Sequence, residues 1–263
     1  MKPEEISRRI GLARALSKVG YCSRSKAFAL IRTGHVRLNG CVCRDPESPV
    51  HLHRDHIAVD AQTIKRSEGM YLMMNKPRGV VTTASDEKGR NTVYSLLNEA
   101  SATEEGKSRA QGILPWVAPV GRLDKASEGL LLLTNDSEWG ARIAAPETRL
   151  NKTYHVQVAT VAEERFIQTL VRGVKTKDGE VLRAKRVRAL RSGQKNCWLE
   201  IVLDEGKNRH IRRMMEGMGV EVLRLVRVAI GPLELGELAK GTYRPLYGDE
   251  KKRLDHALRG STL

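Results

Sequence analysis

Residues 121–136 read GRLDKASEGLLLLTND, and their pattern is the strongest indication of how the larger part of the chain folds. A short basic turn carries one carboxylate, Asp124, and the apolar run Leu130–Leu133 follows it as a strand pattern. A rigid strand can hold a carboxylate in a cleft, where it is suited to nucleophilic or acid-base work. Most loop Asp residues are instead caps or solvated charges, so this spacing alone identifies no reaction.

Strand patterns broken by Gly and Pro dominate the chain on both sides of this stretch. Tyr71–Met74 predicts a buried strand that runs into a turn at 75–79, and later strands are expected at 153–158 and 198–203. Residues 101–112 are small, polar or charged without any period, which predicts a mobile loop. A helical period returns before Gly219, at Ile211, Met214, Met215 and Met218. Mixed strands with few helices predict an α+β domain over residues 70–248.

A smaller helix-helix-hairpin unit is predicted before this domain, over residues 10–67. Residues 12–19 have a helical apolar face, and a second helix is expected after Ser23, an N-cap residue type, and before Gly34. Asn39-Gly40 is a strong signal for a type I′ hairpin turn. The chain at 61–69 has the polar composition of a linker. The two ends, 1–9 and 249–263, are expected to be polar tails.

The charge of the chain favours a polyanionic partner. Forty-six Lys and Arg against 31 Asp and Glu give a net charge of +15 among 263 residues, and neutralising phosphates releases their counterions. Residues 1–68 hold 13 Lys and Arg against 7 Asp and Glu, a net charge of +6 in about a quarter of the length. Nucleic acid is the first candidate partner. A membrane is a weak one, since no segment approaches the roughly 18 apolar residues of a spanning helix.

The N-terminus and the four cysteines favour a reducing, cytoplasmic location. Met1–Glu5 has no apolar segment and two early acidic residues, which argues against a signal peptide. Four cysteines do not amount to a disulfide framework in a chain of this length. Cys41 and Cys43, followed by His51 and His53, allow a metal site, but Cys-x-Cys is not the usual zinc spacing and both pairs can simply alternate along strands. We expect no metal.

The order of features in the smaller unit resembles the RNA-binding domain of ribosomal protein S4. The resemblance covers roughly residues 10–60 and is carried by LARAL at 12–16, CSRSKA at 22–27, LIRTGHV at 30–36 and LNG at 38–40. It implies that the two helices lie on an RNA backbone, whereas a run of exposed cations can also be an ordinary solvated surface. The expected RNA contacts in this unit are Arg14, Lys18, Arg24, Lys26, Arg32 and Arg37.

The larger domain resembles the bacterial ribosomal-RNA pseudouridine synthases of the RsuA type. Four blocks occur in the family's order: NKPRG at 75–79, GRLDKASEGLLLLTND at 121–136, KTY at 152–154 and EGKNRHIRRM at 205–214. Together with the smaller unit, the resemblance covers nearly the whole chain and implies a mixed, mainly antiparallel sheet flanked by helices. Departures are small: Ser127 replaces the usual Thr, Ser137 a common Gly, and Arg209-His210 the frequent His-Gln. They leave the contacted RNA position open.

Three residues take catalytic roles by this resemblance: Asp124 as the catalytic carboxylate, Tyr154 as the aromatic ring against the target base, and Arg212 as the basic partner of the carboxylate. Taken without the resemblance, Tyr154 would fill a core and Arg212 would be a surface helix charge. Arg122 is more suited to touching a phosphate or orienting its loop. The expected RNA contacts of the larger domain are Lys76, Arg122, Lys152, Lys207, Arg209 and Arg213.

The implied reaction moves uracil from its N1 to its C5 linkage on the same ribose, so we expect no cofactor. The favoured substrate is ribosomal RNA or a ribosomal precursor particle, with 23S preferred to 16S because residues 205–214 look more like those of the large-subunit members. Two readings compete: a non-catalytic RNA-binding or ribosome-assembly factor, and an RNA N-glycosidase that releases uracil. We expect a monomer. Whether a covalent sugar adduct or a glycal forms is open.

Overall fold

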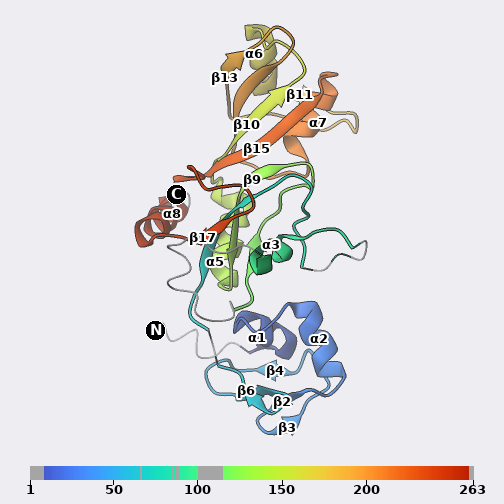
Figure 1. The fold of residues 1–263 in the computed structure, drawn as a ribbon, viewed down its shortest axis with the longest axis vertical. Coiled ribbons are helices and arrows are strands. Elements are labelled where there is room, and N and C mark those ends of the chain that lie inside the picture. The colour runs from blue at the N-terminus through green and yellow to red at the C-terminus, as the bar shows by residue number, and fades with distance from the viewer. Residues whose placement is uncertain (1–8, 66, 85, 87–88, 100–114, 261–263) are drawn as a thin grey trace. The chain divides into compact units, whose positions relative to one another are not determined.

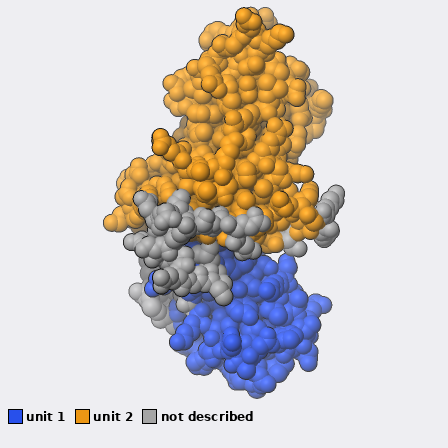
Figure 2. All heavy atoms as spheres, in the orientation of Figure 1, with its two compact units in different colours: residues 1–71, 110–118, 133–137 blue, residues 72–109, 119–132, 138–263 orange. Residues whose placement is uncertain are grey.

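The computed structural model describes residues 9–65, 67–84, 86, 89–99 and 115–260. The chain divides into two compact units, shown in different colours in Figure 2. Unit 1 comprises residues 1–71, 110–118 and 133–137, and unit 2 comprises residues 72–109, 119–132 and 138–263. The predicted loop at 101–112 and residues 1–8 of the predicted tail at 1–9 lie outside the described residues.

Unit 1 is built from two helices and short strands around a small apolar core. The helices are α1 (Leu12–Lys18) and α2 (Arg24–Arg32), and a four-stranded sheet has the order β3 (Cys41–Val42), β2 (Val36–Leu38), β5 (Ile57–Val59) and β6 (Gln62–Thr63). A further pair joins β1 (Ile10–Gly11) to β4 (Pro49–Val50). The core contains Leu12, Leu16, Ala27, Ile31 and Val36. The predicted helices and hairpin are therefore confirmed.

Two local signals in unit 1 act as the sequence predicts. The Ser23 side chain accepts a hydrogen bond of 3.2 Å from the backbone N of Lys26, which caps α2. Asn39 and Gly40 have φ of 52° and 87°, the positive values that a type I′ turn requires at both positions. The His51-Leu52-His53 segment differs from the expectation, because it forms a turn rather than a strand.

The central sheet has seven strands in a continuous path in the described part of the chain (Figure 1). Two short strands pair at its side: β16 (Leu233–Glu234) on β15 and β8 (Ala118–Val120) on β9. All registered pairs are antiparallel except β9 with β15, which is parallel. The α+β prediction is confirmed. The path runs through β13 (Arg186–Ser192), β14 (Cys197–Leu203), β10 (Lys152–Val158), β15 (Val222–Ile230), β9 (Glu128–Thr134), β7 (Tyr71–Lys76) and β17 (Tyr243–Pro245).

Helices supply the apolar cover of the central sheet. One core cluster joins Val156, Leu199 and Leu225 of the strands to Met214 and Met215 of α7 (His210–Gly217). Leu170 of α6 (Glu164–Arg172) belongs to the same cluster. The other elements in this part are α3 (Val93–Glu99), α5 (Ser137–Ala144), the short 3-10 helix η2 (Pro146–Thr148), and the hairpin of β11 (Val174–Lys175) with β12 (Val181–Leu182).

Two predicted boundaries are wrong. The strand β7 continues to Lys76, although a turn was expected from Asn75. The segment expected to be a polar tail from 249 instead forms α8 (Gly248–Gly260), in which Leu254 and Leu258 are buried. These two leucines are four residues apart and so share one helical face, and burying that face stabilises a helix whose composition is otherwise polar.

Candidate active site

Asp124 lies in the loop between β8 and β9, and its position follows from the close packing of β9 on β15. Gly129 of β9 faces Arg227 of β15 and has φ of 104°. A Cβ at this position would lie 2.2 Å from the carbonyl oxygen of Arg227, so no larger residue fits without a backbone shift. The glycine thus brings the start of β9, and the loop that precedes it, close to β15.

A buried lysine fixes the backbone of the Asp124 loop. The Lys76 ammonium donates hydrogen bonds to the carbonyl oxygens of Pro77, Asp124 and Ser127 at 3.0, 3.2 and 2.9 Å. The side chain is 0% exposed. Burial lowers the pKa of Lys76 to about 8, and the nearby charges of Asp124 and Glu128 act in the opposite direction. Lys76 was expected to contact RNA, but a fully buried ammonium with three carbonyl acceptors cannot reach a phosphate, so that expectation is wrong.

A cavity of about 360 Å³ adjoins this loop and is within the size range of small-molecule sites, roughly 300–1,000 Å³. Asp124 and Tyr154 both line it, as do Arg122 and Lys152. Tyr154 is half-buried on β10 and packs against the same apolar cluster as α7. The structure therefore brings two of the three expected catalytic residues to one hollow. Its apolar lining includes Leu203, Ile211, Leu225 and Ile230.

Arg212 lies beside the Asp124 loop but does not line this cavity. Its Nη2 donates a 3.0 Å hydrogen bond to the carbonyl oxygen of Ala126. No ion pair within 4.0 Å joins Arg212 to Asp124 in the described residues, and Nε of Arg212 is buried without a hydrogen-bond partner. Burial lowers the pKa of Arg212, whereas the charge of Asp124 raises it. Arg212 thus contacts the backbone of the loop, and its pairing with the carboxylate stays a prediction.

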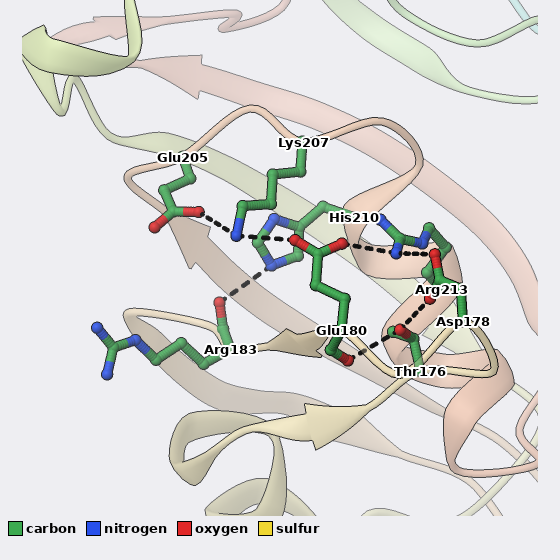
Figure 3. A network of polar contacts seen from close by, with 8 residues as sticks. All are labelled: Thr176, Asp178, Glu180, Arg183, Glu205, Lys207, His210 and Arg213. Carbon is green, nitrogen blue, oxygen red and sulfur yellow. Dashed lines mark hydrogen bonds and ion pairs between the residues drawn. The ribbon is translucent and has the colours of Figure 1, made fainter.

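A network of ion pairs includes Lys207, which lines the cavity (Figure 3). Lys207 lies 3.0 Å from Glu180 and 3.1 Å from Glu205. Arg213 lies 2.6 Å from Asp178 and 2.7 Å from Glu180. The turn between β11 and β12 is thereby joined to the 205–209 loop and to α7. Both cations were expected to contact RNA, and each already has acidic partners.

His210 adds a buried contact to this network. Its Nε2 lies 3.1 Å from the carbonyl oxygen of Arg183, while Nδ1 is buried without a partner (Figure 3). Burial lowers the pKa of His210, and the hydrogen bond to Arg183 acts in the opposite direction. The neutral ring that donates from Nε2 fits this geometry best, because a second proton on Nδ1 would be buried with no acceptor.

The other cationic residues that were expected to contact RNA differ in their exposure to solvent. Arg122 and Arg209 are exposed, and Arg209 pairs with Glu216 at 2.9 Å. In unit 1, Lys18 is half-buried, and the other five expected contacts are exposed and form no ion pair with an acidic side chain of the described residues: Arg14, Arg24, Lys26, Arg32 and Arg37. These five therefore have no acidic partner among the residues that the structure describes. Their contact with RNA stays a prediction.

Two charged groups near the loop were not singled out from the sequence. Glu128 is buried and pairs with Arg224 at 2.9 Å and with Lys240 at 2.8 Å. Arg227 is buried, lines the cavity and donates from Nε to the carbonyl oxygen of Leu130 at 2.8 Å. The available signal was the run VLRLVRVAI at 222–230, where Arg227 lies two residues after Leu225 and shares its side of the strand. A charged residue at an inward position of an apolar strand indicates a site.

The described residues contain neither a candidate metal site nor a candidate membrane-spanning helix. Among these residues, no group of three or more His, Cys, Asp or Glu side chains could hold a metal ion. No described helix is long and apolar enough to cross a membrane. The described cysteines, Cys22, Cys41, Cys43 and Cys197, are all free thiols.

Comparisons with known proteins agree with this geometry. A family model described as RNA pseudouridylate synthase matches residues 70–217, and one described as S4 domain matches residues 10–57. The chain is 34% identical over 244 residues to "Ribosomal large subunit pseudouridine synthase B" of Bacillus subtilis, covering 92% of this chain and 94% of that protein. An "Uncharacterized RNA pseudouridine synthase" of Aquifex aeolicus is also 34% identical, covering 92% of each chain.

A solved structure is similar to this chain in fold as well as in sequence. It is described as "Crystal structure of pseudouridylate synthase", with a TM-score of 0.60, 28% sequence identity, and coverage of 93% of this chain and 99% of that one. The two family matches account for both predicted resemblances, the smaller unit and the larger domain. The chain belongs to the RNA pseudouridylate synthase family and carries an S4 domain before the synthase domain.

Proposed function

We propose that this protein converts a specific uridine of large-subunit ribosomal RNA into pseudouridine, with Asp124 as the nucleophile. The observation that carries the proposal is that Asp124 and Tyr154 line one cavity. The backbone of the Asp124 loop is fixed there by hydrogen bonds from the buried Lys76 ammonium. The large-subunit substrate is supported by the Bacillus subtilis relative, whose name states that activity.

The proposed reaction begins with extrusion of the target uridine, because a base stacked in RNA cannot enter the cavity. Extrusion costs a few kcal/mol, which stacking on Tyr154 and polar contacts in the pocket offset. The N1 to C1′ bond then breaks, uracil turns, and C5 joins C1′. The atoms of substrate and product are the same, so no group donor, oxidant or water is consumed. Asp124 acts at C1′ or on the 2′ proton.

Binding of the remainder of the RNA rests on phosphate contacts. The five exposed cations of unit 1 have no acidic partners among the described residues, so they are available to replace counterions along an RNA backbone. We infer a monomer that acts on naked rRNA or on a ribosomal precursor particle in the cytoplasm.

The test is tritium release from rRNA labelled at C5 of uridine, with the Asp124→Asn variant and with Asp249→Asn as a matched control. Asp249 lies at the exposed start of α8, so the same chemical change is made away from the cavity. We expect loss of turnover in Asp124→Asn, with RNA affinity retained, and wild-type turnover in the control. Turnover by Asp124→Asn within tenfold of wild type would reject the nucleophile.

Two outcomes separate the competing functions. Free uracil in the product would indicate an N-glycosidase, and RNA binding without any tritium release by the wild type would indicate a non-catalytic factor. The substrate is tested by mapping pseudouridines in rRNA from a deletion strain, using carbodiimide-dependent stops of reverse transcription. A missing modification in 16S rather than 23S rRNA would overturn the large-subunit assignment.

A further inference from the structure

Two buried cations share the sheet face that carries Tyr154. Lys152 lies two residues before Tyr154 on β10, so both side chains project to the same face. Arg227 of β15 is the direct cross-strand partner of Tyr154. All three residues line the cavity that Asp124 also lines. The side chains of Lys152 and Arg227 are only 9% and 6% exposed.

Among the described residues, no acidic side chain lies within ion-pair distance of these two cations. In the described residues, neither Lys152 nor Arg227 forms an ion pair, and the one hydrogen bond of the Arg227 guanidinium runs from Nε to the Leu130 carbonyl. Nη2 of Arg227 is buried without a partner. Burial lowers the pKa of Lys152, the charge of Arg227 lowers it further, and Asp204 acts in the opposite direction.

Burying two like charges together is costly unless a ligand compensates them. Natural proteins leave few buried polar groups unpaired, and such groups often mark a functional site. The ligand that fits two cations beside an aromatic ring is a planar anion. A charge of that kind arises in the cavity during the proposed reaction, although the substrate itself is a neutral base.

We propose that Lys152 and Arg227 form a binding site for the uracil anion that is released when the N1 to C1′ bond breaks. This inference rests on the proposed function. The electron pair of the broken bond passes to N1 and is delocalised over O2 and O4. On one route the Asp124 carboxylate forms a bond to C1′. On the other route the sugar loses its 2′ proton and becomes a glycal. In the later steps C5 bonds to C1′, either as the bond from C1′ to the Asp124 carboxylate breaks or as the 2′ proton returns to the sugar. C5 then releases its own proton and N1 gains one, so the overall change is an isomerisation.

The apolar lining makes such a contact effective. Leu203 and Leu225 line the cavity together with the two cations, and charges interact more strongly where water is excluded. A contact that strengthens as negative charge develops lowers the barrier to bond breaking rather than the substrate affinity. Lys152 and Arg227 are therefore expected to affect the rate of cleavage more than RNA binding.

The experiment measures single-turnover consumption of the target nucleoside in two RNAs, one with uridine and one with 5-fluorouridine, at saturating enzyme. Fluorine withdraws electrons and stabilises the uracil anion by itself. We expect Lys152→Met and Arg227→Gln each to slow the uridine reaction about 10²-fold, the usual cost of removing one such stabilising group. The slowing for 5-fluorouridine should be at least about tenfold smaller. Equal slowing of both RNAs would overturn the proposal.

Three further measurements make the result specific. Arg227→Lys keeps the charge and should recover part of the rate lost in Arg227→Gln, which a purely structural role would not predict. Arg186→Gln removes an exposed charge from the opposite face of the same sheet, where Arg186 pairs with Val202, and should react like wild type with both RNAs. Weaker RNA binding with unchanged cleavage would assign the pair to a phosphate and reject the proposal.

Failure of the proposed function is distinguishable from failure of this inference. A wild-type protein that consumes neither nucleoside fails the proposed function. A wild type that consumes both, with variants slowed equally, fails only the inference. Circular dichroism and urea unfolding of each variant establish that the fold is kept. Lys152→Met serves as the second variant, because the Lys152 ammonium donates no hydrogen bond to the backbone of the described residues.

Discussion

The ammonium of Lys76 lies 3.2 Å from the backbone carbonyl oxygen of Asp124, in a site that water does not reach. The same nitrogen also binds the carbonyl of Ser127, three residues further along the loop. A residue at the end of β7 thus fixes the loop backbone at the expected nucleophile itself and at the end of the loop, just before β9. The carboxylate itself forms no hydrogen bond to the described residues.

Lys76→Met should therefore reduce catalysis without changing RNA affinity. The variant keeps an apolar chain of similar length but leaves buried carbonyls unpaired, which costs about 1–3 kcal/mol of stability. A misplacement of the carboxylate by about 1 Å can cost roughly 10²-fold in rate. Single-turnover tritium release and filter binding measure the two effects. Lys177→Met, at an exposed position, is the control. Weaker RNA binding with an unchanged rate would restore Lys76 to the RNA contacts.

Arg212 is expected to act through the loop that it contacts at Ala126. Arg212→Lys keeps the charge but loses the planar arrangement of donors, so it should slow catalysis although the change appears conservative. Arg212→Ala should be slower still, by roughly 10²-fold, because the Ala126 carbonyl loses its donor and Asp124 loses a nearby cation. Full activity of Arg212→Ala in single-turnover assays would show that the carboxylate's basic partner is another residue.

The sequence predicts elements whose signals are local. The type I′ turn at Asn39-Gly40 and the cap at Ser23 depend only on neighbouring residues, and both form as expected. The apolar run Leu130–Leu133 is fully buried in β9. In contrast, α8 was missed because Leu254 and Leu258 are its only buried apolar side chains among many charged neighbours. Their value to the fold depends on a surface formed elsewhere in the chain.

The site was predictable to the extent that it follows motifs. Asp124 and Tyr154 line one cavity, as the family resemblance implies. The burial of Lys76 was not predictable from NKPRG, because its acceptors Asp124 and Ser127 lie 48 and 51 residues away. Arg227 was missed for a similar reason: its meaning comes from the register that sets it opposite Tyr154. Long-range pairing decides what a charged residue in a strand contacts.

The exposed cations of unit 1 should set the salt dependence of RNA binding. Replacing Arg24 and Lys26 of α2 by Gln should weaken affinity and reduce the slope of log K against log salt by about 1 to 2, since each phosphate contact contributes roughly 0.7 to 0.9. The turnover rate at saturating RNA should not change. Arg253→Gln, where an exposed α8 cation already pairs with Asp249, is the matched control. An unchanged salt slope in the double variant would mean that α2 does not bind the phosphate backbone.

His210 should make the protein less stable in mild acid. Its folded pKa is lowered chiefly by burial, so between the ordinary value of 6.5 and the lower folded value the unfolded chain binds the proton more readily. The stability contributed by the neutral ring is complete above pH 6.5 and is lost as pH falls towards the folded pKa. One proton changes the free energy of unfolding by at most about 1.4 kcal/mol per pH unit.

The measurement is urea unfolding of wild type and His210→Gln between pH 7.5 and pH 5.5. Glutamine can still donate to the Arg183 carbonyl, but it does not titrate, so the variant should lose less stability over this range. The surrounding charges of Glu205, Lys207 and Glu180 remain in both proteins. His155, whose pKa is also lowered by burial, leaves some pH dependence in the variant. If the two proteins lose stability in parallel, His210 does not titrate in this range, and the acid sensitivity arises from other groups.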